Sequence, residues 1–286
     1  MVPDKNLTDA EFIGLRDFIY KKIGILFTER NRFLLDARIR EILLQTGHKD
    51  ALTYLKSLND PAVNPAEVSR LINKVTITET SFFRDPHQIN AMARNVIPEI
   101  AKRHEAIGAR LLTVWSAGAS SGEEAYTLAI LLAEHFKDDL PKWNITIFAT
   151  DINDEALQVC KAGVYKSYAL RNTPPALRDR YFRALPDDRF AVRDDLKRLV
   201  MPQKSNLMDY SGSKRYTGAD LILLRNVMIY FEAGTKAQVL SMCYENLREN
   251  GYLFLGQSET AFGISHAFKL VTFVNAFAYK KVPPLR

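Results

Sequence analysis

Apolar residues in the first quarter of the chain recur every three to four positions, which is the spacing of amphipathic helices. Four helices are expected, over about 7–23, 31–45, 50–58 and 66–74. Thr8 followed by Glu11 predicts a capping box at the start of the first helix, and Gly47 predicts the end of the second. We therefore expect residues 1–76 to form a small all-α N-terminal domain, which either docks a partner or covers part of a larger domain.

The pattern changes after residue 77, where short apolar runs alternate with helical segments. Buried strands are expected over about 111–115, 145–149, 220–224 and 252–255, with a terminal antiparallel pair within 268–280. Strands that alternate with helices predict a mostly parallel, doubly wound sheet with helices on both faces. We therefore expect residues 77–286 to form one α/β domain. The irregular stretch 161–204 interrupts the alternation and predicts a small subdomain inserted into that domain.

The positive charge of the chain comes from this predicted insertion. The whole sequence has 39 Lys and Arg residues against 33 Asp and Glu residues, a formal net charge of +6, and residues 161–204 alone have 11 against five. A basic patch on an otherwise neutral protein indicates an acidic partner that binds at one face. A solvated surface with interspersed acids explains the same counts, so both interpretations stay open at this stage.

Composition narrows the class of protein further. No apolar run approaches the roughly 18–20 residues that a membrane-spanning helix needs, so we expect no direct membrane insertion. The polar, acid-containing start is unlike a secretory signal. Cys160 and Cys243 are the only cysteines, too few for a disulfide framework or a cysteine zinc cluster. We expect a cytoplasmic enzyme without a metal ion.

Small and polar residues follow three of the predicted strands at the point where each strand ends. These strand ends are Ser116–Glu124, Asp151 and Arg225–Asn226. In open α/β sheets the ligand binds at the carboxyl ends of the strands, so we expect these residues to line one site. Gly118 and Gly122 lack the third glycine of the dinucleotide-binding fingerprint, and the Lys-Ser/Thr pair of a phosphate-binding loop does not follow them.

Acids rather than lysines accompany this glycine loop. Glu123 and Glu124 fall in the first turn of the predicted helix, where they would repel a pyrophosphate and attract an ammonium group. Asp151 ends the second strand, where a carboxylate accepts hydrogen bonds from both hydroxyls of a ribose; the alternative is an N-cap of the next helix. A ribose, an ammonium group and no phosphate together describe S-adenosylmethionine.

Ordered motifs across nearly the whole chain carry a family resemblance. They are Thr78–Asp85 (TETSFFRD), Trp115–Glu124 (WSAGASSGEE), Ala149–Ile152 (ATDI), Ser205–Leu207 (SNL), Leu224–Phe231 (LRNVMIYF) and, after the expected interval, Gly256–Glu259 (GQSE). In these motifs the chain resembles the chemotaxis receptor methyltransferases, the CheR-type protein-glutamate O-methyltransferases. The resemblance implies a class I methyltransferase-like sheet domain, S-adenosyl-L-methionine as cofactor and S-adenosyl-L-homocysteine as product.

The resemblance also implies which residues form the site. Cofactor contacts are expected from Thr78, Thr80, Arg84, Ala117, Gly118, Glu124, Asp151, Asn206, Leu207, Arg225 and Asn226. Arg84 and Tyr230 are expected to orient the substrate carboxylate as catalytic residues, with a structural hydroxyl as an equal alternative for Tyr230. Thr78 stands where the family often has Asn, and the choice between Glu123 and Glu124 stays open.

The implied function is transfer of a methyl group to glutamate side chains of chemoreceptors, giving glutamate methyl esters in chemotaxis adaptation. The implied partner is the cytoplasmic helical domain of these receptors, contacted by Arg32, Arg38, Arg40 and the basic insertion 161–204. We expect no nucleic-acid partner. Two alternatives remain at this stage: a signalling adaptor that binds the cofactor without turnover, and a methyltransferase that acts on RNA or a small molecule.

Overall fold

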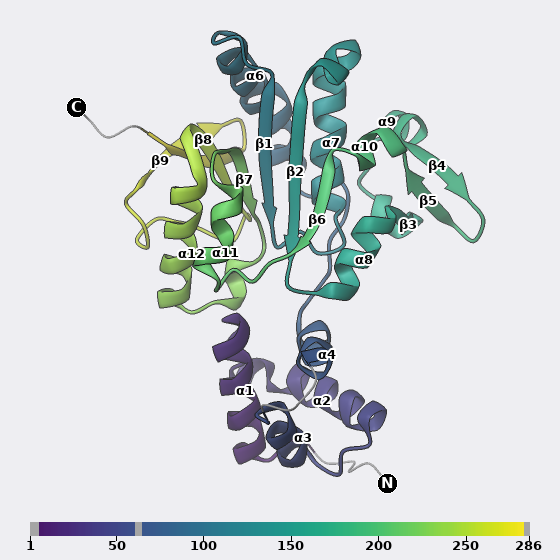
Figure 1. Ribbon diagram of the computed structural model, residues 1–286, viewed down its shortest axis with the longest axis vertical. Helices are drawn as coiled ribbons and strands as arrows, with labels where there is room; N and C mark the ends of the chain where they lie inside the picture. Colours follow the sequence, from purple (N-terminus) through teal and green to yellow (C-terminus); the bar gives the residue numbers. More distant parts are fainter. Residues whose placement is uncertain (1–5, 61–64, 283–286) are drawn as a thin grey trace.

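A computed structural model of the chain describes residues 6–60 and 65–282. Its N-terminal part is a small helical domain (Figure 1). The helices are α1 (Asp9–Ile23), α2 (Arg32–Thr46), α3 (Ala51–Leu58) and α4 (Pro65–Val75), with the 3-10 turn η1 (Glu29–Asn31) before α2. The predicted capping box is confirmed, because Thr8 and Glu11 each accept a hydrogen bond from the other's backbone N–H. The four expected helices are therefore present.

The apolar faces of these helices form a core of their own. Its most buried members are Phe12, Leu15, Ile19, Leu35, Ile39, Ile42, Tyr54 and Leu71. Ile25 and Ile152 pack at the edge of this core, and Ile152 follows a strand of the second domain. The helical domain therefore folds around its own interior and touches the sheet domain at one end.

A linker and a long helical segment lead into the second domain. The segment consists of α5 (Pro86–Ala91), a π-helical turn η2 (Met92–Val96) and α6 (Ile97–Glu105) without interruption. Asp85 caps α5, and its carboxylate accepts from the backbone N–H of Gln88 at 3.3 Å. Pro98 has no N–H to give to a preceding carbonyl, which fits the wider π-helical bonding just before it.

The second domain is built on a seven-stranded sheet with the order β6-β2-β1-β7-β8-β10-β9 (Figure 1). Its strands are β1 (Leu111–Ala117), β2 (Asn144–Asp151), β6 (Val200–Lys204), β7 (Ala219–Leu224), β8 (Leu247–Leu255), β9 (Phe268–Phe273) and β10 (Ala276–Lys281). The first five strands in that order are parallel neighbours, and β10 runs antiparallel to both β8 and β9. The predicted mostly parallel sheet is confirmed.

Helices cover both faces of this sheet, which makes it doubly wound. They include α7 (Glu123–Phe136), α8 (Asp154–Ala162) and α12 (Ala233–Asn246), with the short α11 (Tyr210–Ser213), η3 (Lys137–Lys142), η5 (Lys214–Tyr216) and η6 (Met228–Tyr230) between elements. One apolar cluster joins the sheet to α6 and α7, and a separate cluster joins it to α12. The central strands β1, β7 and β8 therefore bury side chains on two sides, as their near-continuous apolar sequences predict.

A small antiparallel sheet with the order β3-β5-β4 projects beside α8 and β6 (Figure 1). It contains β3 (Val164–Lys166), β4 (Phe182–Leu185) and β5 (Arg189–Val192), together with η4 (Ser167–Leu170), α9 (Pro175–Tyr181) and α10 (Asp194–Lys197). The expected end of the insertion at residue 204 is wrong, because Val200–Lys204 is β6 and pairs in parallel with β2. As an edge strand with a proline in it, β6 has no continuous apolar run to reveal it.

Candidate functional site

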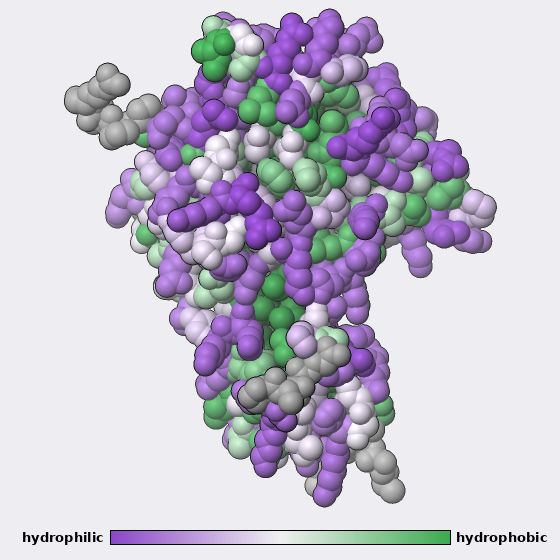
Figure 2. All heavy atoms as spheres, viewed as in Figure 1, coloured by the Kyte–Doolittle hydropathy of each residue, from purple (hydrophilic) through white to green (hydrophobic). Residues whose placement is uncertain are grey.

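A cavity of about 280 Å³ lies at the carboxyl ends of the central strands, between the sheet and the helical domain. Ile23 and Ile25 line it from the helical domain, and the linker contributes Thr76–Ser81 in part. Most of the remaining wall comes from the loops that follow β1, β2, β6 and β7, and α5, η2 and α7 also contribute. Figure 2 shows hydrophobic residues along the junction between the larger and the smaller part of the molecule. The cavity is therefore an interdomain site.

The glycine loop after β1 needs glycine for two separate reasons. Gly118 and Gly122 have φ values of +78° and +93°, in the region that side chains avoid. A Cβ on Gly118 would lie 2.5 Å from Cγ2 of Val227, and one on Gly122 would lie 2.3 Å from Sγ of Cys160. The loop therefore packs tightly against Val227 and Cys160, and Gly118 lines the cavity.

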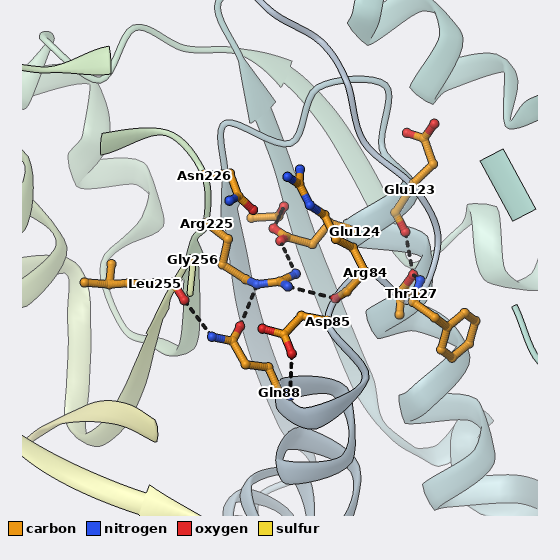
Figure 3. Close-up of polar contacts among 12 residues, drawn as sticks. Arg84, Asp85, Gln88, Glu123, Glu124, Thr127, Arg225, Asn226, Leu255 and Gly256 are labelled. Atoms are coloured by element: carbon orange, nitrogen blue, oxygen red, sulfur yellow. Dashed lines mark hydrogen bonds and ion pairs between the residues drawn. The ribbon is translucent and has the colours of Figure 1, made fainter. Parts of the chain in front are cut away.

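Glu124 faces the cavity and is held by two partners (Figure 3). Ser116 Oγ donates to Oε1 at 2.7 Å, and Nη1 of Arg225 donates to Oε2 at 3.0 Å. Glu123 points away in Figure 3, accepts from Ser121 Oγ at 2.7 Å and does not line the cavity. Burial raises the pKa of the Glu123 carboxyl. Of these two acids, Glu124 lines the cavity and Glu123 does not, which favours Glu124 in the choice that the sequence left open.

Asp151 lies at the end of β2 and lines the cavity. Its two oxygens accept from the backbone N–H of Ser120 at 2.7 Å and of Asn153 at 2.9 Å, while burial raises the pKa of its carboxyl. The alternative of Asp151 as the N-cap of α8 is wrong, because Asn153 caps that helix by accepting from Ala156 N–H. Each carboxylate oxygen has a second lone pair, so Asp151 retains the capacity to accept hydroxyl groups.

Arg84 and Tyr230 both line the cavity. Nη1 of Arg84 donates to the Glu79 carbonyl at 3.3 Å. Burial raises the pKa of the half-buried Tyr230, whose backbone carbonyl accepts from Leu26 N–H at 3.0 Å. Within 6–60 and 65–282, no side chain hydrogen-bonds the Tyr230 hydroxyl, and both roles considered for Tyr230 stay predictions.

The structure brings most of the predicted cofactor residues together. The cavity is lined by Thr80, Arg84, Gly118, Glu124, Asp151, Asn206, Leu207, Arg225 and Asn226. Thr78 and Ala117 do not line it. The Thr78 side chain is exposed and only its carbonyl is engaged, by Ser120 Oγ at 2.8 Å, while Ala117 points into the apolar cluster on the α12 face. Asn206 also joins the domains, since its Nδ2 donates to the Lys22 carbonyl.

Sequence reasoning missed two buried residues behind the cavity wall. Gln88 accepts from Nε of Arg225 at 2.7 Å, and Glu259 accepts from the backbone N–H groups of Asn226 and Ile229. Glu259 belongs to the GQSE motif, to which the sequence assigned no role. Gln88 has no local signal, because an amide on a short helix looks the same whether it is buried or exposed. It is found only through its contacts.

The three arginines expected to contact a partner are already engaged within the chain. Arg32 donates to Asp9 at 2.8 Å and to the Leu7 carbonyl at 2.6 Å. Arg38 donates to the carbonyls of Lys74 and Thr76, and Arg40 donates to Asn6. Arg32 and Arg40 are thus bonded to residues at or just before the start of α1, and Arg38 is bonded to residues at the end of α4 and just after it. Binding a partner through the same guanidinium groups would share or replace them.

Comparison with known proteins identifies the family to which the chain belongs. Residues 78–277 match the family described as "CheR methyltransferase, SAM binding domain", and residues 10–76 match "CheR methyltransferase, all-alpha domain". The chain belongs to the CheR methyltransferase family. It is 32% identical to a "Chemotaxis protein methyltransferase" of Borreliella burgdorferi, with 96% of this chain and 95% of the relative covered.

Two further relatives carry similar names. "Chemotaxis protein methyltransferase 2" of Vibrio cholerae is 30% identical, with 96% of this chain and 94% of the relative covered. The "Chemotaxis protein methyltransferase" of Salmonella typhimurium is 32% identical, with 92% and 88% covered. The sheet domain thus has a mostly parallel, doubly wound fold, and the chain is an S-adenosylmethionine-dependent methyltransferase whose relatives are named as chemotaxis proteins.

The cavity fits this cofactor by its chemistry. It offers acids at Glu124 and Asp151, a backbone loop at Gly118 and apolar walls, with no lysine among its lining residues. That set suits a cationic amino-acid end and a ribose. Within 6–60 and 65–282, no group of three or more His, Cys, Asp or Glu side chains is arranged to hold a metal ion. None of the helices formed by these residues has the length and apolar character needed to span a bilayer.

Proposed function

We propose that this CheR-family enzyme methylates glutamate side chains of chemoreceptors, giving glutamate methyl esters. The observation that carries the proposal is the composition of one cavity, which is lined by the acids Glu124 and Asp151 and also by Arg84 and Tyr230. S-adenosylmethionine supplies a methyl group already activated by a positively charged sulfur. A glutamate carboxylate, with a pKa of about 4.3, is ionised at neutral pH. The protein therefore has no need of a general base.

The residues on the sheet side have the chemistry to hold the cofactor. The Glu124 carboxylate would accept from the ammonium group of the methionine end, and Asp151 would accept from the ribose hydroxyls. Asn206 and Leu207 would flank the adenine, opposite the wall formed by Ile25 of the helical domain. Because one wall comes from each domain, cofactor binding is expected to hold the two domains together.

Arg84 and Tyr230 would orient the substrate. A guanidinium and a phenol hydroxyl both donate hydrogen bonds to a carboxylate oxygen, and both side chains line the cavity. Held in this way, the carboxylate presents its second oxygen toward the activated methyl group. Well-oriented reactions of this kind gain up to about 7–11 kcal/mol from placement alone. Catalysis by orientation therefore suffices here.

The proposed partner is the cytoplasmic helical domain of chemoreceptors. Acidic helices would meet the basic segment 161–204 and the arginines of α2, namely Arg32, Arg38 and Arg40. Each exposed ion pair contributes only about 0–1 kcal/mol, so recognition would be shared among several of them. Arg38 donates to the carbonyls of Lys74 and Thr76, and Thr76 lines the cavity, which supports a role for α2 in binding the partner near the site.

Transfer of a labelled methyl group to receptor fragments tests the proposal. The expected product releases its label in mild base, because a carboxyl methyl ester is base-labile. Cofactor binding without transfer to any fragment would favour an adaptor, and transfer to structured RNA or a small molecule instead would identify a different substrate class.

Substitution of the two orienting residues tests their role. Arg84→Ala and Tyr230→Phe should lower kcat more than they lower the affinity for S-adenosylhomocysteine. Unchanged turnover with intact cofactor binding would refute the assignment.

A further inference from the structure

A buried amide, Gln88 of α5, lies behind the cavity wall and does not line the cavity. Its Nε2 donates to the Leu255 carbonyl at the end of β8, at 2.8 Å, and its Oε1 accepts from Nε of Arg225 at 2.7 Å (Figure 3). A carbonyl only accepts and a guanidinium only donates. These two partners therefore fix which way round the Gln88 amide lies.

Arg225 directs three N–H groups at three acceptors. Nε donates to Gln88, Nη1 donates to Oε2 of Glu124 at 3.0 Å, and Nη2 donates to the Arg84 carbonyl at 2.8 Å (Figure 3). The Arg225 side chain is 4% exposed and that of Glu124 is 14% exposed. Because a guanidinium is planar and rigid, fixing Nε fixes the plane in which both Nη atoms lie. The position of Gln88 thus affects, through Arg225, both the Glu124 carboxylate and the backbone at Arg84.

We propose that Gln88 is a positioning residue of this methyltransferase, acting through Arg225 on Glu124 and on the backbone of Arg84. The inference rests on the proposed function, in which Glu124 receives the cofactor and Arg84 the substrate carboxylate. Ser116 holds one oxygen of Glu124, and Arg225 holds the other. Without Gln88, Arg225 keeps its charge but loses the contact that sets its orientation. The hydrogen bonds from Arg225 to Glu124 and to the Arg84 carbonyl are then weakened together.

The first test replaces Gln88 by an apolar side chain of similar length. Gln88→Met removes both hydrogen-bonding groups and leaves Arg225 and Glu124 in place. The affinity for S-adenosylhomocysteine, measured by calorimetry, is expected to fall about tenfold, which corresponds to about 1.4 kcal/mol. kcat is expected to fall as well, because the Arg84 backbone is released. Gln238→Met, the same change on an exposed position of α12, is the matched control and should bind like the wild type.

A double-mutant cycle with Glu124→Gln separates positioning from general loosening. If Gln88 acts through Arg225 on Glu124, Gln88→Met should weaken binding much less in the Glu124→Gln background than in the wild type. Full additivity would overturn the inference, and so would an unchanged affinity in Gln88→Met accompanied by a lower melting temperature. Failure of the proposed function looks different, because the wild-type protein would then bind S-adenosylhomocysteine but transfer no methyl group to receptor fragments.

Gln88→Glu keeps the inference testable if Gln88→Met does not fold. The carboxylate has the shape of the amide and still accepts from Arg225. It does not donate to the Leu255 carbonyl, and its charge competes with Glu124 for the guanidinium. The affinity for S-adenosylhomocysteine should again fall about tenfold, or about 1.4 kcal/mol. Wild-type affinity in a folded Gln88→Glu protein would overturn the inference.

Discussion

The buried carboxylate of Glu259 accepts hydrogen bonds from the backbone of the segment that carries Asn226 and Tyr230. Replacing Glu259 by a neutral side chain measures how far the stability and the turnover depend on these bonds. Glu259 is 5% exposed. Its Oε2 accepts from the backbone N–H of Asn226 at 2.8 Å and of Gly256 at 2.6 Å, and its Oε1 accepts from Ile229 N–H at 3.2 Å. Glu259→Gln keeps the shape of the side chain and replaces one of these oxygens by an NH₂ group, which does not accept hydrogen bonds.

The magnitude follows from the bonds that are lost. At least one backbone N–H then faces a donor, and the remaining bonds lose their ionic character. A hydrogen bond to a charged group contributes about 1.5–3 kcal/mol, so the free energy of unfolding should fall by about 2–3 kcal/mol. For a domain of this size that is a decrease in melting temperature of roughly 4–12 °C. Turnover should fall too, because the turn η6 that ends at Tyr230 contains Ile229.

Thermal unfolding without added cofactor and methyl transfer under saturating cofactor are the two assays. Glu245→Gln removes an exposed acid of α12 and is the matched control, with unchanged melting temperature expected. If Glu259→Gln melted at the wild-type temperature and turned over at the wild-type rate, the charge on Glu259 and its three backbone hydrogen bonds would contribute nothing measurable to the free energy of unfolding. The reasoning would then be refuted.

Two further predictions follow from nearby positions. Gly256→Ala should lower the melting temperature and the turnover in the same way, because a Cβ there would lie 2.7 Å from Oε2 of Glu259 and 2.9 Å from Asn226 N. A Gly256→Ala protein that unfolds at the wild-type temperature in scanning calorimetry would contradict this prediction. Burial raises the pKa of the Glu123 carboxyl, so between its ordinary and its raised pKa the folded chain binds more protons than the unfolded chain, and this group makes folding less favourable as the pH rises. Glu123→Gln should remove that loss and gain stability over the wild type through the same pH window, as measured by urea unfolding; equal pH slopes would count against it.

Properties that depend on neighbouring positions in the chain could be predicted from the sequence. The helices of the N-terminal domain follow from apolar spacing and from the capping box of Thr8 and Glu11. The parallel sheet follows from apolar runs that alternate with helices, and the site follows from the rule that ligands bind where such strands end. Acids in place of lysines at Glu124 and Asp151 indicated a ligand without phosphate. These inferences need only local pattern and chemistry.

Tertiary structure alone decided which of several similar residues takes each position. Glu123 and Glu124 share one helical turn but differ by roughly 100° around the axis, and only packing shows which of them faces the cavity. Asn153, two residues after Asp151, proved to be the helix cap. The strand β6 escaped prediction because it pairs with β2 across a long stretch of chain and is half-exposed.

The supporting contacts of the site join residues that are far apart in the sequence. Gln88 and Arg225 are separated by 137 positions, and the wall at Ile23 and Ile25 comes from another domain. Hydrophobic periodicity carries no information about such pairs, because it reports only which face of an element is buried. The residue types that line the cavity were therefore set by the sequence, while their orientation was set by the packing of distant elements.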